Sequence, residues 1–475
     1  MLDAARAALA DAAGDDAKVL SALTDRVDTI ACVEPFAWAY ESLARGVADR
    51  LGLRENIAEL HVPAGGNSPQ DLLHDIAERI AAGESDCALL TGGESVYSRN
   101  RARREGIELD WPTRPSNHDF MGGQLPFSSD LELRHGLRLP IQAFPMLENA
   151  IQAANDRTPR EQIALAAHLL ARNATVAARD PLAWFRDAPT AEQIATVSPD
   201  NRMICYPYTK RMNAIMDVDQ GAALLILSEK LAREMGLFDS CAVVLGGAGA
   251  EDAWYLSERR MYSQSVTMNA AVRAAFDHAA VNTSDLDAFD LYSCFPSAIE
   301  FGCSAAGLST DDPRPLTLTG GLAYAGGPGN AYVLCALAAG LRSMRSGEAR
   351  RILVTGVGMA CAKLTATVLS RSDSIPEDAS GKTQRRVGVD VRAARTVQNP
   401  KGDASVETWT IEYNRDGSVG NVIYILSLED GRRTVANAAG DPDPTARDLL
   451  EHQPIGRRGT VQHDPESGVN TLTLR

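Results

Sequence analysis

The sequence predicts an α/β protein built from two similar halves, followed by a small all-β domain. One helix-then-strand unit, entered each time through a glycine-rich turn, occurs twice, about 264 positions apart. The strands of these units are short, wholly apolar runs, which are typical of buried parallel strands. After residue 384 the apolar pattern changes to the two-residue period of half-buried strands.

Composition restricts the function classes. A chain of 475 residues exceeds a single ordinary core, so several domains are expected. The net charge of −15 argues against a nucleic-acid partner, and no apolar run is long enough to cross a membrane. Eight cysteines without a CxxC pair indicate reduced, buried thiols in a cytoplasmic protein. We find no cysteine or histidine spacing that is typical of a metal site.

The first repeated unit is GGNSPQDLLHDIAERIAAGESDCALLTGG, residues 65–93. Ser68 predicts the N-cap of a helix, and Asp71 completes a pattern like a capping box. Gly83 predicts the end of that helix. The run CALLT then predicts a buried strand, because it is apolar and bounded by glycine-containing turns.

The second repeated unit begins with TGGLAYAGGPGNAY, residues 319–332, and ends with the strand-like run RILVTG at 351–356. Asn330 precedes its helix as Asn67 precedes the first one. A helix N-terminus offers free N–H groups and partial positive charge, which suit a thiolate, an oxyanion or a phosphate. The alternative is that these glycines only let the two halves pack tightly.

The C-terminal segment has the pattern of a separate domain. The polar stretch at 371–384 predicts a linker, and 385–475 predicts a small all-β barrel or sandwich. VETWTIEY alternates as a strand does, NRDG predicts a turn, and Asp430-Gly431 predicts a hairpin.

Five ordered blocks resemble the thiolase superfamily and cover most of residues 1–370. They are LLTGGESVYS (89–98), DVDQGAALLILSEKLAREMGL (217–237), DLDAFDLYSCFPSAIE (285–300), TLTGGLAYAGGPGNAY (317–332) and LVTGVGM (353–359). The resemblance is to the sterol-carrier-protein-type, acetyl-CoA-acetyltransferase-like branch of type 1. It implies a duplicated αβαβα fold with halves at 1–238 and 239–370, a helical loop domain at about 99–200, and an extra C-terminal OB-like β-barrel.

The departures from the family pattern concern its catalytic residues. The position of the nucleophilic cysteine falls on Gly66 or Asn67, and the position of the family histidine falls on Gly327. The second family cysteine falls on Val354, and the family asparagine falls on Tyr292. The sequence therefore predicts that thiolysis through an acyl-cysteine does not occur.

Cysteine-free members of this branch include retro-aldolases that cleave β-hydroxyacyl-CoA and use tyrosines. The resemblance therefore implies Tyr324 and Tyr292 as catalytic residues, acting on a CoA thioester as substrate with no bound cofactor. The C-terminal barrel looks like a fused version of the partner domain of those enzymes. The glycine-rich turns and their neighbours would form the thioester pocket: Gly66, Asn67, Gly326, Gly327 and Gly356.

Three functions remain open at this point: a C–C lyase acting on acyl-CoA, a cysteine-free acyltransferase, and a non-catalytic CoA-thioester binder or scaffold. Acyl-CoA is the expected partner, and a homodimer through the thiolase-like core is a further expectation. The family opens with an apolar strand that we expect to be central in its sheet, whereas this chain opens with the helix-like residues 1–13. We therefore expect either a native start upstream of Met1 or a first half without that strand.

Overall fold

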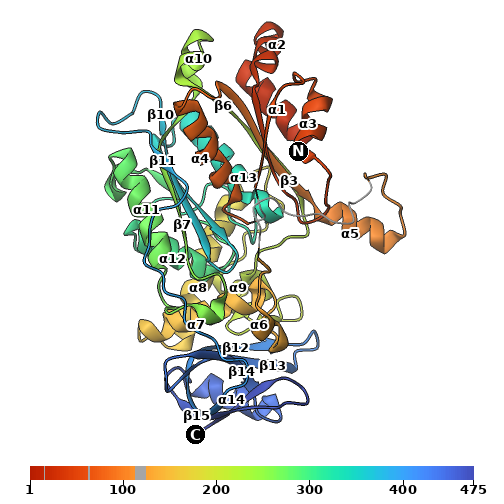
Figure 1. Ribbon diagram of the computed structural model, residues 1–475, viewed down its shortest axis with the longest axis vertical. Coiled ribbons are helices and arrows are strands. Elements are labelled where there is room, and N and C mark those ends of the chain that lie inside the picture. The colour runs from red at the N-terminus through yellow and green to blue at the C-terminus, as the bar shows by residue number, and fades with distance from the viewer. Residues whose placement is uncertain (15, 63–64, 113–124) are drawn as a thin grey trace.

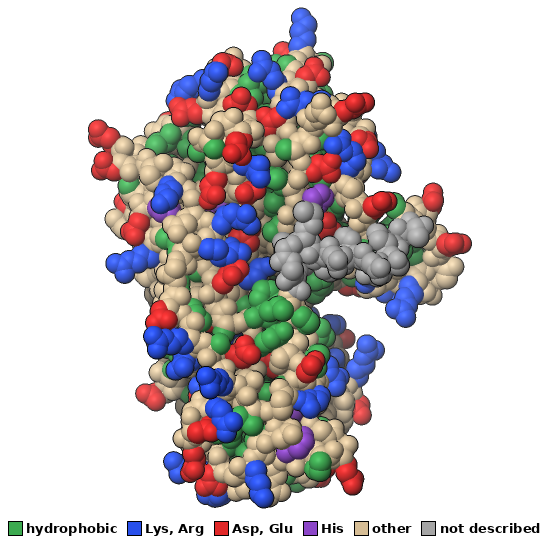
Figure 2. Space-filling model, viewed as in Figure 1, with side chains coloured by type: hydrophobic (Ala, Val, Ile, Leu, Met, Phe, Trp, Pro, Cys, Tyr) green, Lys and Arg blue, Asp and Glu red, His purple; other side chains and the backbone are tan. Residues whose placement is uncertain are grey.

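Figure 1 shows the computed structural model, which describes residues 1–14, 16–62, 65–112 and 125–475. A two-sheet core lies at one end of the long axis, helices α6 to α9 lie in the middle, and a barrel lies at the other end. This arrangement confirms the predicted fold class, a duplicated α/β core with a small C-terminal barrel. Figure 2 shows charged side chains of both signs intermingled over the face in view.

The sheet of the first half has the strand order β2-β1-β3-β6. β1 lies parallel to β2 and β3, and β6 lies antiparallel to β3. The run CALLT lies in β3, as the sequence predicts, and β3 is buried over nearly its whole length. The strands and helices of this half are α1 (Leu2–Ala13), α2 (Ala17–Arg26), β1 (Thr29–Val33), α3 (Leu43–Leu51), β2 (Ala58–Val62), α4 (Ser68–Ala81), β3 (Cys87–Ser95), α5 (Val96–Glu105), β6 (Asp219–Leu227) and α10 (Glu229–Glu234).

The second half repeats this pattern with the order β11-β7-β10-β9-β8. β8 lies parallel to β9, and β10 lies antiparallel to both β9 and β7. RILVTG is confirmed as part of β9. The elements of this half are β7 (Ala242–Glu251), α11 (Val266–Ala279), β8 (Ala288–Asp290), α12 (Pro296–Ala306), α13 (Tyr332–Arg345), β9 (Arg351–Gly358), β10 (Lys363–Arg371) and β11 (Thr383–Gln384).

Helices α4 and α13, one from each repeated unit, pack against both sheets and form the inner layer. α4 begins at Ser68, so its N-cap is Asn67 and not Ser68 as the sequence predicts. The side-chain amide of Asn67 donates a hydrogen bond to Asp71 at 2.7 Å, so the predicted capping box is replaced by this contact. The apolar face of α4 is buried because it lies between two sheets.

The expectation that a missing first strand would be central is wrong. The central place in the first sheet belongs to β1, between β2 and β3. Comparison with the second half shows that the first half differs at its edge. β10 pairs with β7 on its outer side, whereas β6 pairs only with β3 among the described strands. The core sheet therefore keeps its internal pairing without that strand.

The middle of the molecule holds helices that lie within the predicted loop-domain range. α8 begins with a capping box made by Thr158 and Glu161, as its sequence favours. Its inner face carries alanine and leucine residues that join the main core. The helices are α6 (Asp130–Arg134), α7 (Pro140–Ala154), α8 (Pro159–Ala177) and α9 (Ala191–Ala195).

The C-terminal domain is a barrel closed by five strands in the order β13-β14-β16-β15-β12, since β12 also pairs with β13. The predicted hairpins are confirmed by the antiparallel pairs β12–β13 and β13–β14. The domain is not purely β, because helix α14 buries Ala446 and Leu449 against it. Its elements are β12 (Lys401–Tyr413), β13 (Val419–Leu428), β14 (Arg433–Ala438), α14 (Pro442–Glu451), β15 (Arg458–His463) and β16 (Asn470–Leu474); β4 (Met203–Cys205) and β5 (Tyr208–Thr209) extend its sheet.

The barrel is attached to α7 by side-chain hydrogen bonds. The side-chain amide of Asn149 donates to the carbonyl of Trp409 at 2.9 Å, and the Thr408 hydroxyl donates to the carbonyl of Met146 at 2.5 Å. The predicted linker, 371–384, also contacts the core, because its last two residues form β11 beside β7. The barrel and the helical segment therefore share one apolar contact surface.

Three further observations bear on the expectations from composition. No helix in the described part of the chain is long and apolar enough to cross a membrane. All eight cysteines are free thiols, and only Cys241 and Cys335 are half-buried while the others are buried. The described residues contain no group of histidine, cysteine, aspartate and glutamate side chains that could hold a metal ion.

Candidate functional site

The phenol of Tyr292 lies directly over Gly66. Gly66 belongs to the turn between β2 and α4, and Tyr292 follows β8. A Cβ atom added to Gly66 would clash with the Tyr292 hydroxyl and with the carbonyl oxygen of Val357 in β9. Glycine is required here because three segments meet at this point, and the phenol occupies the space of any side chain at this position.

Tyr292 is held as a protonated phenol. Its ring is buried and meets the ring of Tyr332 edge-on, with centroids 5.5 Å apart. Its backbone N–H donates to the Thr355 hydroxyl at 2.9 Å. Burial raises the pKa of Tyr292 well above its ordinary value, and the nearby thiols raise it further. At neutral pH this side chain is therefore a hydrogen-bond donor or an acid, not a base.

Asp290 bonds to Tyr332 and not to Tyr292. The Tyr332 hydroxyl donates to Asp290 at 3.1 Å, and the N–H of Leu318 donates to it at 2.7 Å. Burial raises the pKa of Asp290 to about 6, against the opposing effect of these hydrogen bonds. Sequence reasoning missed Tyr332, although it is the second tyrosine of TGGLAYAGGPGNAY.

The last residues of the glycine-rich loop contact the α4 turn. The N–H of Gly65 donates to the side-chain oxygen of Asn330 at 2.8 Å, and Asn330 donates in turn to the carbonyl of Glu34. The first of these hydrogen bonds joins the two repeated units at their matching asparagine-containing turns. The two glycine-rich turns are therefore in direct contact.

Tyr324 faces another part of the molecule. Its phenol donates to the carbonyl of Arg211 at 3.3 Å, and burial raises its pKa. A Cβ atom on Gly326 would clash with the Gln220 side chain, and the N–H of Gly327 donates to the carbonyl of Ile215 at 2.8 Å. These three residues are therefore held against segment 211–220, whereas Tyr292 is the tyrosine at the α4 turn.

Gly356 and Asn67, two further residues of the predicted pocket, lie in contact. A Cβ atom on Gly356 would lie 3.0 Å from the Cα atom of Asn67. The side-chain oxygen of Asn67 is buried and has no hydrogen-bond partner among the described residues. Beside it, Met359 and Cys361 adopt left-handed φ angles of 56° and 62° in the turn between β9 and β10. Such strain in non-glycine residues is concentrated at functional sites.

Comparison with known proteins agrees with this fold. Residues 385–466 match the family model described as the thiolase-like protein type 1 additional C-terminal domain. A monomeric SCP2-thiolase-like protein type 1 from Mycobacterium smegmatis is similar over 100% of this chain and 94% of its own, with a TM-score of 0.80 and 29% identity. The chain therefore has a thiolase-like fold, and its C-terminal domain matches the additional domain of thiolase-like protein type 1. A comparison with curated protein sequences finds no match.

No thiol is activated as a nucleophile at the α4 turn. Burial raises the pKa of Cys361 to about 12 and that of Cys294 well above its ordinary value. The two thiols are therefore protonated at neutral pH, because burial outweighs every other effect on their pKa values. This agrees with the absence of a cysteine at Gly66 or Asn67.

Lys363 is a polar residue of the site that sequence reasoning missed. It opens β10 and is 5% exposed, with its Nζ atom 3.4 Å from the place of a Cβ atom on Gly65. Burial lowers the pKa of Lys363. The α4 N-terminus, Lys363 and the Tyr292 phenol together form a donor-rich site that suits an oxygen atom with developing negative charge. Nothing in its local sequence singles out Lys363 as a buried lysine.

Proposed function

We propose that this thiolase-like protein binds a CoA thioester at the Gly66 turn and breaks a carbon–carbon bond in it, with β-hydroxyacyl-CoA as the substrate class. The observation that carries the proposal is the Tyr292 phenol over Gly66. It stands where a side chain of residue 66 would project, at the N-terminus of a buried helix. A protonated phenol at that place supports chemistry on a thioester carbonyl without an acyl-cysteine.

The reaction would be a retro-aldol cleavage. The β-hydroxyl loses its proton, its C–O bond becomes a carbonyl, and the bond between Cα and Cβ breaks. The electron pair of that bond forms the thioester enolate, which takes a proton at Cα to give a shortened acyl-CoA. Tyr292 would donate a hydrogen bond to the enolate oxygen, together with N–H groups of the Gly66 turn.

Tyr324 remains our proposed proton-transfer residue, as expected from the resemblance. For this role its phenol would have to leave the carbonyl of Arg211, to which it now donates, and pass its own proton to a base as it takes the β-hydroxyl proton, because burial raises the pKa of Tyr324. Tyr332 with Asp290 is the pair that already adjoins Tyr292. The β-hydroxyl proton has two candidate routes, one through Tyr324 and one through the Tyr332–Asp290 pair. Variants of Tyr324 and Tyr332 therefore distinguish these routes.

The test is cleavage of a panel of β-hydroxyacyl-CoA esters, with the acyl-CoA and carbonyl products measured separately. Tyr292→Phe should slow turnover by about 10²–10³, the cost of one lost oxyanion donor, while the Kd for the CoA ester changes little. Tyr324→Phe should slow turnover by about 10²–10⁴ if that phenol moves the proton. Full activity in both variants would remove the tyrosines from the mechanism.

A second candidate is a CoA-thioester binder without catalysis. The burial of Tyr292 against Tyr332 favours it, because a fully packed ring also explains the glycine at position 66. This candidate predicts binding of CoA esters without turnover over the same panel. It also predicts that Tyr292→Phe affects stability and leaves ester binding unchanged.

A further inference from the structure

The side-chain amide of Asn67 has a fixed orientation at the N-terminus of α4. Its N–H group donates to one oxygen of Asp71 at 2.7 Å, and Arg386 donates to the other oxygen at 3.0 Å. A carboxylate paired with an arginine only accepts hydrogen bonds, so the nitrogen of the Asn67 amide must face Asp71. The amide oxygen therefore faces away from Asp71, toward the turn that precedes α4.

This oxygen has a defined place but no donor. Asn67 is fully buried, and its Oδ1 atom has no hydrogen-bond partner within the part of the chain that the structure describes. Cβ atoms added to Gly65 and Gly358 would clash with Oδ1, so both positions need glycine to make room for the amide. A buried acceptor without a donor costs free energy and is rare in native proteins. This arrangement suits a site whose donor is supplied by a ligand.

The groups around this oxygen are those that we assign to the thioester. Gly66, which lies under the Tyr292 phenol, directly precedes Asn67. Lys363 lies beside the same turn, with its Nζ atom 3.4 Å from the place of a Cβ atom on Gly65. The Asn67 oxygen is enclosed, so a ligand would reach it by displacing the long and flexible Lys363 side chain. An acceptor therefore adjoins the donors that would hold the thioester oxygen.

The chemistry of a CoA thioester limits which donor can fill this place. The cysteamine amide lies two carbons beyond the thioester sulfur, and its N–H group is present in every CoA ester. The β-hydroxyl of the proposed substrate is another donor near the carbonyl, but it gives up its proton during the cleavage. An amide oxygen does not take up a proton at neutral pH. It therefore suits the cysteamine N–H, which keeps its hydrogen throughout the reaction.

We propose that Asn67 Oδ1 accepts a hydrogen bond from the cysteamine amide of the bound thioester, and that Asp71 and Arg386 are positioning residues that hold the Asn67 amide for this contact. The inference rests on the proposed function, because it places the thioester at the Gly66 turn. Arg386 belongs to the segment after β11 that leads into the barrel, and an ion pair of 2.7 Å joins it to Glu251 of β7. The C-terminal part of the chain would therefore help to form the thioester site.

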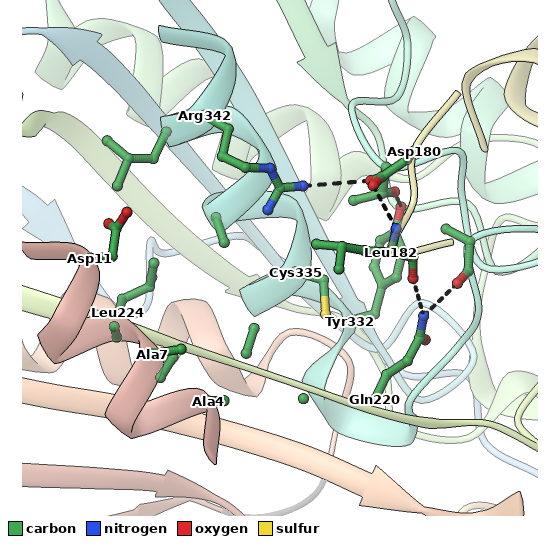
Figure 3. Close-up of a pocket in the computed structure, with 18 of the residues that line it drawn as sticks. Ala4, Ala7, Asp11, Asp180, Leu182, Gln220, Leu224, Tyr332, Cys335 and Arg342 are labelled. Carbon is green, nitrogen blue, oxygen red and sulfur yellow. Dashed lines mark hydrogen bonds and ion pairs between the residues drawn. The ribbon is translucent and has the colours of Figure 1, made fainter. Parts of the chain in front are cut away.

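Gln220 provides a comparison, because its amide oxygen is also buried without a hydrogen-bond partner among the described residues. Figure 3 shows Gln220 at a pocket between α1 and α13, where its amide donates to the carbonyls of Leu182 and Ala325 at 3.1 and 2.7 Å. It lies on β6, beside the loop of Tyr324 and not at the Gly66 turn. Gln220→Ala is therefore a control for the loss of a buried amide.

The experiment compares two acylpantetheine thioesters with the same saturated acyl group. One carries the cysteamine amide, and in the other an ester oxygen replaces the N–H of that amide. Neither can be cleaved because both lack a β-hydroxyl, so titration calorimetry gives their Kd values at equilibrium. The variants are Asn67→Ala, Arg386→Gln and Arg386→Lys. Arg385→Gln is the second control, since Arg385 pairs with Asp75 of α4 at 3.6 Å and Asp75 lies one turn beyond Asp71.

We expect the natural protein to bind the amide about tenfold more tightly than the ester, because the ester leaves the Asn67 oxygen without a donor. Asn67→Ala should abolish this preference and Arg386→Gln should reduce it, whereas Arg386→Lys should keep most of it. Gln220→Ala and Arg385→Gln should leave it unchanged. Arg386 is exposed, so Arg386→Gln carries the test if Asn67→Ala does not fold.

The proposal is wrong if the natural protein binds both thioesters equally, if Asn67→Ala keeps the preference, or if Arg385→Gln reduces it as much as Arg386→Gln. It is also wrong if Asn67→Ala instead removes a preference for a β-hydroxyacyl over a saturated thioester, because the β-hydroxyl would then be the donor. Such a result together with cleavage of β-hydroxyacyl-CoA would leave the proposed function intact. Absence of binding for every thioester would overturn both.

Discussion

Glu148 and Glu300 are two buried carboxyl groups that share one donor. The side-chain amide of Gln162 donates to an oxygen of each at 2.6 Å. Arg157 donates to Glu300 at 2.8 Å, whereas Glu148 contacts the hydroxyl of Tyr208. Two negative charges this close in the interior repel one another, so the pair of carboxyl groups holds one proton. Because Arg157 stabilises a negative charge on Glu300, the proton lies on Glu148.

The first prediction concerns pH. Burial, and then the charge of Glu300, raise the pKa of Glu148 from 4.5 to about 8. The folded protein therefore keeps a proton that the unfolded chain releases, and the free energy of unfolding falls as the pH rises from 4.5 through 8. Glu148→Gln should reduce this fall, which urea denaturation at a series of pH values measures.

The control for this prediction is Glu192→Gln, an exposed glutamate in the same helical segment. It should keep the pH dependence of the natural protein. A Glu148→Gln variant with the same slope as the natural protein would show that the shared proton lies elsewhere. The slope for one proton is at most about 1.4 kcal/mol per pH unit.

The second prediction concerns packing at the Gly66 turn. Gly66→Ala should lower stability by about 1–3 kcal/mol, because the added methyl group meets the Tyr292 hydroxyl and a backbone carbonyl. Thermal unfolding measures this, and Gly388→Ala is the control, since nothing lies within 4 Å of its added Cβ atom. If the two variants were equally stable, the close approach of Tyr292 would not exist in solution.

The third prediction concerns the absent nucleophile. Thiolysis of acetoacetyl-CoA should not exceed the uncatalysed rate, because the buried thiols are protonated and none lies at the helix N-terminus. Mass spectrometry after incubation with acetoacetyl-CoA should find no acyl adduct on any cysteine. An ordinary thiolase serves as the positive control, and turnover at its rate would contradict this prediction.

The fourth prediction concerns the connection to the barrel. A glutamate-specific protease should cut first at Glu377, which is exposed within the predicted linker 371–384. The two fragments should stay together on gel filtration, because α7 and β12 remain joined by the hydrogen bonds of Asn149 and Thr408. Fragments that separate at once, or a first cut inside the barrel, would argue against this contact.

Local features of the fold follow from local sequence. The apolar runs CALLT and RILVTG are buried strands, and the alternation of VETWTIEY forms a barrel strand. The two glycine turns at matching places also predicted the duplication correctly. These features depend on neighbours a few residues apart, so periodicity and turn chemistry are sufficient to predict them.

The arrangement of the candidate site was decided by tertiary packing. Tyr292 and Gly66 are far apart in sequence, and only the meeting of β8, β9 and α4 places the phenol over the glycine. Tyr324 and Tyr332 lie in one glycine-rich segment, Tyr324 in its loop and Tyr332 as the first residue of α13, yet packing places Tyr332 beside Tyr292 and turns Tyr324 toward Arg211. Side-chain direction in an irregular loop depends on long-range contacts, which no local pattern encodes.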